Sequence, residues 1–135
     1  TDEQRVSHLL KLRELQDETR GFCAFVPLAY NPGNNGLRGV KRTSGFLDLK
    51  VLSISRLLLD NIPHIKAHGS ATDLKFVQVA LSFGADDVGG TNLHEKVMRE
   101  AGSHAPEGLS SDDLIRCIID AGFKPCLVDS SYSIK

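Results

Sequence analysis

The sequence has no tryptophan, one methionine and only three cysteines among its 135 residues. Cys23, Cys117 and Cys126 are odd in number and scattered, so they do not form the framework of a disulfide-stapled domain. No C-x-x-C pair occurs, and this chain therefore carries no zinc or iron–sulfur motif of that kind. The pattern favours buried thiols in a reducing cytoplasm.

Charge excess and long apolar runs are also lacking. The formal net charge is -1, which argues against a nucleic-acid or anionic-membrane surface. No apolar run approaches the roughly 20 residues that span a bilayer, and the first residues have no signal-peptide layout. Neither a Ser-His-Asp elbow nor a cysteine in a nucleophile context is present. What remains is a cytoplasmic domain with neither membrane nor nucleic-acid partners.

Apolar periodicity predicts helices that alternate with strands along the chain. Helices are expected over residues 6–20, 44–60, 72–84, 92–102 and 110–122, and strands over 22–29, 62–68 and 85–91. Ser110 with Asp113 resembles a capping box, and Gly21 is placed to close the first helix. That helix has one apolar stripe, with charges on the other side, formed by Val6, Leu9, Leu10, Leu12 and Leu15. The tail, residues 124–135, is expected to form a final extended segment.

Strands that alternate with helices imply right-handed crossovers and a parallel sheet. About three parallel strands cannot close a barrel, because closure takes about eight. The fold class is therefore α/β, and residues 1–135 form a single domain. It is either the C-terminal part of a TIM-type (βα) barrel or a small open sheet complete in itself.

Polar residues gather around the predicted strand ends. In parallel α/β folds the carboxyl ends of the strands form the functional face. Three clusters are expected there: Tyr30 with Asn31, residues 64–68, and residues 86–91. This convergence is the best signal for a binding site that the residues themselves give.

The second strand alternates in polarity. Ile65 and Ala67 should point one way, while His64, Lys66 and His68 point the other. Three cation-capable groups on one face suit a carboxylate or phosphate ligand. A solvated edge strand is the alternative, and a metal site is disfavoured because lysine is a poor ligand.

Two adjacent carboxylates open the third cluster. Neighbouring residues on a strand point to opposite faces, so at most one of Asp86 and Asp87 should enter a pocket, as an acid, a base or a holder of sugar hydroxyls. The other would cap the following turn. Gly89-Gly90-Thr91 can offer N–H groups to an anion, although it lacks the spacing of a phosphate-binding loop.

Three stretches carry a family likeness: LKLRELQDETRGFCAFVPLA (10–29), LKVLSISRLLLDNIPHIKA (49–67) and QVALSFGADDVGGTNLHEKVMREAG (78–102). Together they resemble the C-terminal part of the radical S-adenosylmethionine (SAM) enzymes of the futalosine route to menaquinone. This family includes aminofutalosine synthase and dehypoxanthine futalosine cyclase, and the deazaflavin synthase subunit and biotin synthase share its layout. PHIKA followed by ALSFGADD is nearer to the aminofutalosine synthase branch than to the cyclase.

The resemblance implies a TIM-type barrel whose other part holds a 4Fe–4S cluster through a Cys-x3-Cys-x2-Cys motif. The cluster cleaves SAM to a 5′-deoxyadenosyl radical, which adds to the double bond of a carboxyvinyloxy-benzoate. It implies that Val26, Pro27 and Leu28 lie near the adenine of SAM. It also implies that the carboxylate substrate is bound by Tyr30, Asn31, His64, Lys66, His68, Asp86, Asp87 and Thr91. Without the cluster motif, this chain alone should bind no cofactor and be inactive.

The chain departs from the family pattern at Arg20, where glycine is usual, and at two places beside the expected pocket, Tyr30-Asn31 and residues 68–70. Other interpretations stay open. One is that the protein is a dehypoxanthine futalosine cyclase or a radical SAM protein similar to biotin or thiamine synthase. Two more take the chain as it stands. The chain is a free-standing ligand-binding module that kept the later strands, or an interaction domain that self-associates through exposed barrel edges.

Overall fold

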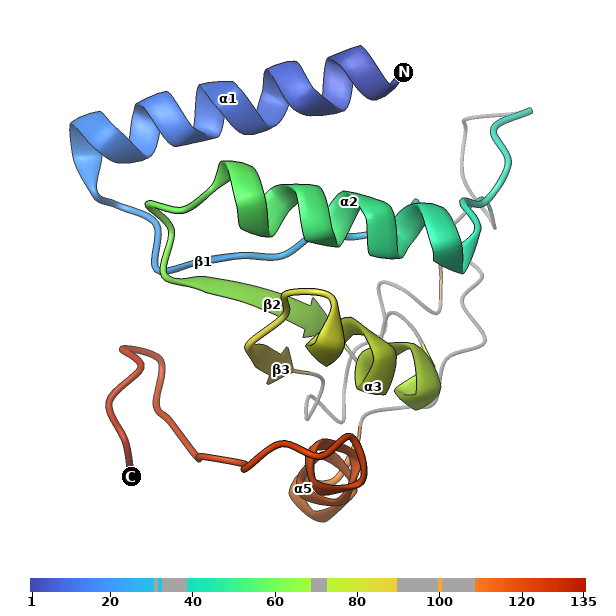
Figure 1. The fold of residues 1–135 in the computed structure, drawn as a ribbon, viewed down its shortest axis with the longest axis vertical. Coiled ribbons are helices and arrows are strands. Elements are labelled where there is room, and N and C mark those ends of the chain that lie inside the picture. The colour runs from blue at the N-terminus through green and yellow to red at the C-terminus, as the bar shows by residue number, and fades with distance from the viewer. Residues whose placement is uncertain (31, 33–38, 69–72, 90–99, 101–108) are drawn as a thin grey trace.

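The structure, a computed structural model, describes residues 1–30, 32, 39–68, 73–89, 100 and 109–135. Its elements follow in the order α1 (Asp2–Thr19), β1 (Ala24–Phe25), α2 (Gly45–Leu58), β2 (His64–His68), α3 (Leu74–Ser82), β3 (Asp87–Gly89) and α5 (Ser111–Asp120). The strands form one parallel sheet in the order β1-β2-β3 (Figure 1). The predicted α/β alternation is confirmed, and the helix expected over residues 92–102 lies outside the described residues.

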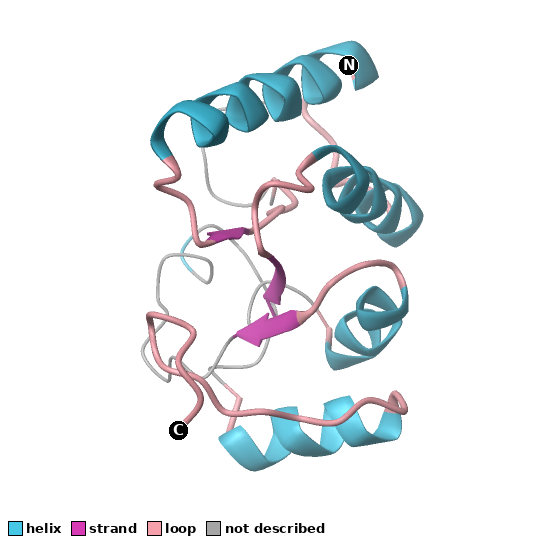
Figure 2. Cartoon of the chain, turned by 60° about the vertical axis from the view of Figure 1, so that its left-hand side comes forward, coloured by secondary structure: helices cyan, strands magenta, loops and turns pink. Residues whose placement is uncertain are grey.

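The sheet has one face covered by helices and one polar face. Ile65 and Ala67 of β2 are 0% and 3% exposed and belong to the core that α1, α2, α3 and α5 build. His64, Lys66 and His68 alternate with them and are partly exposed on the other face, which we call the polar face. Figure 2 shows the helices in an arc around the strands, with the C-terminal segment on the opposite side. The predicted alternation of β2 is therefore confirmed.

Helix α1 begins with a local capping box and buries only part of the predicted apolar stripe. The Thr1 hydroxyl accepts from the Gln4 N–H, and the Gln4 side chain accepts from the N-terminal amine. Leu9 and Gln16, two helical turns apart, are the buried residues. The apolar stripe is therefore only partly buried: Leu9 is buried and Leu12 packs against the core. Its other members are exposed: Val6, Leu10 and Leu15.

The buried Gln16 side chain ties α1 to the sheet. Its Nε2 donates to the carbonyl oxygens of Phe22 (2.9 Å) and Asn61 (3.2 Å), and its Oε1 accepts from the Phe22 N–H (2.8 Å). The amide therefore satisfies three backbone groups in the segments that lead into β1 and β2. A buried amide with all these partners stabilises the fold, whereas an unpartnered one would destabilise it.

Helix α1 closes one residue earlier than predicted. Arg20, not Gly21, takes the left-handed conformation (φ 50, ψ 28), and its N–H donates to the Gln16 carbonyl at 2.8 Å. Any L-residue is strained there by its Cβ, which is why glycine is the usual choice. The predicted capping box of Ser110 with Asp113 is confirmed at the start of α5.

Strand β1 is shorter than the predicted strand 22–29. Only Ala24 and Phe25 pair with β2, opposite His64 and Ile65. Pro27 has no N–H to donate to a ladder, so pairing ends before it. The chain continues from there along the sheet to Tyr30 at its carboxyl edge.

The C-terminal tail forms a hairpin-like turn, in which Val128 and Ile134 make an isolated antiparallel bridge. The expectation of a simple extended segment is therefore wrong. The expectation of buried thiols holds for Cys117 alone, because Cys23 and Cys126 are exposed. No helix of the described residues is long and apolar enough to cross a membrane.

Candidate functional site

The predicted site residues divide between the two edges of the sheet. Strand β2 begins at His64 and ends at His68, and Asp86 precedes the first residue of β3. Tyr30 and His68 lie at the carboxyl edge, whereas His64 and Asp86 lie at the amino edge. The expectation that all of them gather at the carboxyl ends is wrong, because the short loop after α3 brings the chain back into the sheet at the amino edge.

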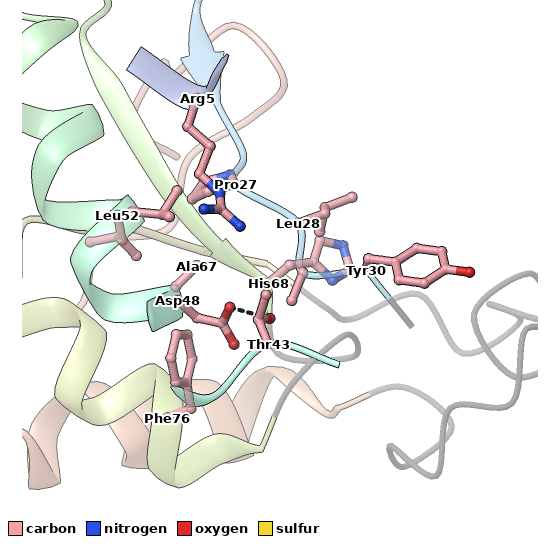
Figure 3. Close-up of a pocket in the computed structure, with 12 residues that line it drawn as sticks. Arg5, Pro27, Leu28, Tyr30, Thr43, Asp48, Leu52, Ala67, His68 and Phe76 are labelled. Carbon is pink, nitrogen blue, oxygen red and sulfur yellow. Dashed lines mark hydrogen bonds between the residues drawn. The ribbon is translucent and has the colours of Figure 1, made fainter. Parts of the chain in front are cut away.

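A cavity of about 260 Å³ lies at the carboxyl edge (Figure 3). It opens between the segment that follows β1, the end of β2 and the N-terminal ends of α1, α2 and α3. In a parallel α/β fold this edge is where ligands bind. Its walls are formed by Arg5, Pro27, Leu28, Ala29, Tyr30, Thr43, Asp48, Val51, Leu52, Ala67, His68 and Phe76.

The cavity combines apolar walls with a few charged groups. Leu28 is 58% exposed and Phe76 lies at the far side, so an aromatic ligand would find apolar surface there. Asp48 in the first turn of α2 accepts from the Thr43 hydroxyl at 2.5 Å. Arg5 brings a guanidinium from α1 to the same cavity. The arrangement suits a small molecule that has both a ring and a charged group.

Asp86 holds the amino edge together. Its carboxylate accepts from the Ile65 N–H at 2.8 Å, lies 2.7 Å from His64 Nδ1 and pairs with the Arg56 guanidinium of α2. Partial burial raises the pKa of Asp86, but these three neighbours outweigh it, and the pKa lies below its ordinary value. Asp86 therefore stays ionised at neutral pH and links β2, β3 and α2.

Asp87 gathers two donors on the polar face. Its Oδ2 accepts from Lys66 Nζ at 2.9 Å and from the Tyr132 hydroxyl at 2.5 Å. The Tyr132 ring stacks on His64, with centroids 3.8 Å apart and planes at 10°. Burial and the bond to Asp87 raise the pKa of Tyr132 above its ordinary value, so the phenol remains a donor.

Sequence reasoning missed five polar residues of the cavity, the amino edge and the polar face: Arg5, Thr43, Asp48, Arg56 and Tyr132. The first three precede or open helices, and helices that follow parallel strands begin at the carboxyl edge. That rule was a usable signal for Thr43 and Asp48, whereas α1, which carries Arg5, precedes all the described strands. No pattern in the tail indicates that Tyr132 returns to the sheet.

The other predicted site residues are only partly placed. Pro27 and Leu28 line the cavity and Val26 precedes them. Asn31 and Thr91 lie outside the described residues. Among the residues that the structure describes, no three His, Cys, Asp or Glu side chains are grouped to hold a metal ion.

Fold and site together define a class. An open parallel sheet with helices on one face and a cavity at the carboxyl ends of its strands is part of a (βα)-type ligand-binding or enzyme fold. The family described as the CofH/MqnC C-terminal region matches residues 19–135, and the chain belongs to this family. The family that the sequence resembles is thereby confirmed.

Curated relatives match nearly the whole chain. It is 43% identical over 136 residues to aminodeoxyfutalosine synthase of Thermus thermophilus, covering 98% of this chain and 37% of that protein. It is 40% identical to cyclic dehypoxanthine futalosine synthase of Streptomyces coelicolor, covering 86% and 29%. It is also 40% identical to a 5-amino-6-(D-ribitylamino)uracil–L-tyrosine 4-hydroxyphenyl transferase of Methanoculleus marisnigri, covering 90% and 34%. The chain spans about a third of the length of these relatives.

Proposed function

We propose that the protein containing this chain is a radical SAM enzyme of the cytoplasm that makes aminodeoxyfutalosine for menaquinone from a carboxyvinyloxy-benzoate. The observation that carries the proposal is the 43% identity to a synthase of that name over 98% of the chain. The cavity at the carboxyl edge supports it, because its apolar walls and its charged groups suit an aromatic carboxylate.

The described residues suit SAM but not the cluster. Val26, Pro27 and Leu28 would cover the adenine, and the exposed apolar surface of Leu28 in the cavity wall fits a planar base. SAM, when bound, supplies the 5′-deoxyadenosyl group that is transferred. Cys23 and Cys126 are exposed and far apart in sequence from each other, and they form no cluster motif. The 4Fe–4S cluster would therefore be held by another part of the protein, and we expect this chain alone to be inactive.

The substrate carboxylates would meet the donors of β2 and the segment after β1. Tyr30 and His68 reach the cavity, and Lys66 adds a cation on the polar face. A charge-assisted hydrogen bond to a carboxylate is about twice as strong as a neutral one. Asn31 and Thr91 stay predictions, and the remaining predicted residues support Lys66 and the amino edge: His64, Asp86 and Asp87.

The proposal is tested with the full-length protein under anaerobic conditions, with SAM and a reductant. Three substrates are offered separately: the carboxyvinyloxy-benzoate, dehypoxanthine futalosine, and 5-amino-6-(D-ribitylamino)uracil with L-tyrosine. Formation of aminodeoxyfutalosine, seen by its mass, is the expected result. Turnover of only one of the other two substrates would place the protein with the corresponding relatives and refute the assignment.

The cavity itself is tested by a matched pair of histidine variants. His68→Asn removes a group at the cavity and should raise KM for the carboxylate substrate roughly tenfold, the loss expected for one charge-assisted hydrogen bond. His8→Asn changes an exposed histidine on α1 and should leave KM unchanged. Equal kinetics for both variants would remove His68 from the substrate site.

A further inference from the structure

The C-terminal turn is built to hold one tyrosine in an uncommon conformation. The Asp129 side chain accepts from the N–H groups of Ser131 (2.8 Å) and Ser133 (3.0 Å), and the Asp129 carbonyl accepts from the Tyr132 N–H at 3.1 Å. Tyr132 has φ 61, a region that non-glycine residues seldom occupy. The strain is tolerated because the surrounding turn fixes the backbone, and such strain often marks a functional position.

Tyr132 touches three predicted substrate-binding residues at once. Its ring stacks on His64 at 3.8 Å, its hydroxyl donates to Asp87 at 2.5 Å, and Lys66 Nζ lies 5.9 Å from its ring centroid. Lys66 and Asp87 are partners in the register of β2 and β3, so their ion pair spans the polar face. The tail thus shares Asp87 with the cation that the proposed substrate needs.

We propose that Tyr132 is a positioning residue that lets Lys66 exchange Asp87 for a substrate carboxylate. Asp87 Oδ2 accepts from both Lys66 and Tyr132, and its side chain is only 13% exposed. When a bound anion draws Lys66 away, the Tyr132 hydroxyl still satisfies the poorly hydrated Asp87. Without that hydroxyl, the same movement leaves Asp87 without either donor, which is costly at a site shielded from water.

This inference rests on the proposed function, in which Lys66 meets a substrate carboxylate. It goes further by assigning to the tail an effect on substrate affinity. A tail that merely stabilises the fold would change the resistance to unfolding and leave the affinity for the substrate unaltered. The two roles are therefore separable by experiment.

The kinetic test compares variants of the full-length enzyme. Tyr132→Phe keeps the stacked ring and removes only the hydroxyl, so it should raise KM for the carboxylate substrate roughly three- to tenfold with kcat changed less than about twofold. In a Lys66→Met background the same change should have less than about a twofold effect on KM, because both act through one interaction. Leu127→Ala, in the same tail but 68% exposed, is the control and should leave KM unchanged.

A second readout needs no turnover. The rate at which an amine-reactive reagent labels Lys66, relative to the exposed Lys124, is measured by mass spectrometry in the wild type and in Tyr132→Phe. With Asp87 left to Lys66 alone, the ion pair loses its competitor and shields the amine from the reagent for more of the time, so labelling should slow about threefold. If the wild type turns over no carboxylate substrate, the proposed function fails. The labelling result still tests whether Tyr132 competes with Lys66 for Asp87.

An unchanged labelling ratio overturns the competition between Tyr132 and Lys66 for Asp87. An unchanged KM in Tyr132→Phe, or an equal rise in KM with and without Lys66, overturns the positioning role. A lower unfolding midpoint as the sole effect of Tyr132→Phe overturns it as well, because the tail would then be structural.

Discussion

Replacing Arg20 with glycine should stabilise the protein, although it removes a long side chain. Arg20 sits at φ 50 and ψ 28, close to the ideal left-handed conformation, and closes α1 with its own N–H. Its Cβ makes this conformation unfavourable by about 1–2 kcal/mol. Glycine removes that strain but gives the unfolded chain more freedom, worth about 0.5–1 kcal/mol. The difference between the midpoints of these ranges predicts a gain of about 0.8 kcal/mol for Arg20→Gly.

The gain is measured as a shift of the urea midpoint at an unchanged slope, using the full-length protein. Glu14→Gly is the matched control, because Glu14 is exposed in the interior of α1 and glycine there should cost about 1 kcal/mol. Arg20→Ala separates backbone from side chain, since alanine keeps the strained Cβ and should give no gain. If Arg20→Ala stabilises as much as Arg20→Gly, the strain argument is refuted.

Two further predictions concern stability. Gln16→Ala should destabilise the protein by about 2–4 kcal/mol in urea unfolding, because three backbone groups lose their partner, while the exposed Glu18→Ala should be nearly neutral. A small loss in Gln16→Ala would mean that water replaces the amide. The pKa of Asp86 is lower in the folded protein than in the unfolded chain, where it is about 3.9. The ionised Asp86 therefore adds to the free energy of unfolding above the unfolded pKa, and this contribution is lost as pH falls through the lower folded pKa. Urea midpoints from pH 7 to pH 3 should therefore show the deficit of Asp86→Asn shrinking below about pH 4, and a pH-independent deficit would contradict the role of its charge.

The predictions that the structure confirms rest on patterns among residues that are close together in the sequence. The capping box of Ser110 and Asp113 depends on groups three residues apart, and the alternation of residues 64–68 follows from the geometry of any strand. Both can be recognised without knowing the rest of the fold. The order of helices and strands follows in the same way from the period of the apolar residues.

Contacts between distant parts of the chain were not predictable in this way. Gln16 is buried by segments that the sequence does not mark as its neighbours, and the Tyr132 hydroxyl meets Asp87 across 45 positions of sequence. His64 and Asp86 lie at the amino edge, and not at the carboxyl edge, because of the positions at which β2 and β3 begin in the sheet. An apolar run shows that a strand exists, but its first paired residue is set by its neighbour.

The strand order β1-β2-β3 has a consequence for how such proteins diversify. Each strand in the described part pairs only with the strand next to it in sequence, so no strand is threaded between two others. Genetic recombination at the start of such a segment would transfer whole strands together with their helices. The hybrid protein would then inherit an intact carboxyl edge of the sheet. Relatives with three different names align with this same stretch at 38–43% identity. The stretch that aligns with residues 1–135 can be exchanged between these relatives as a block. Such hybrids would show whether this third of each relative selects its substrate.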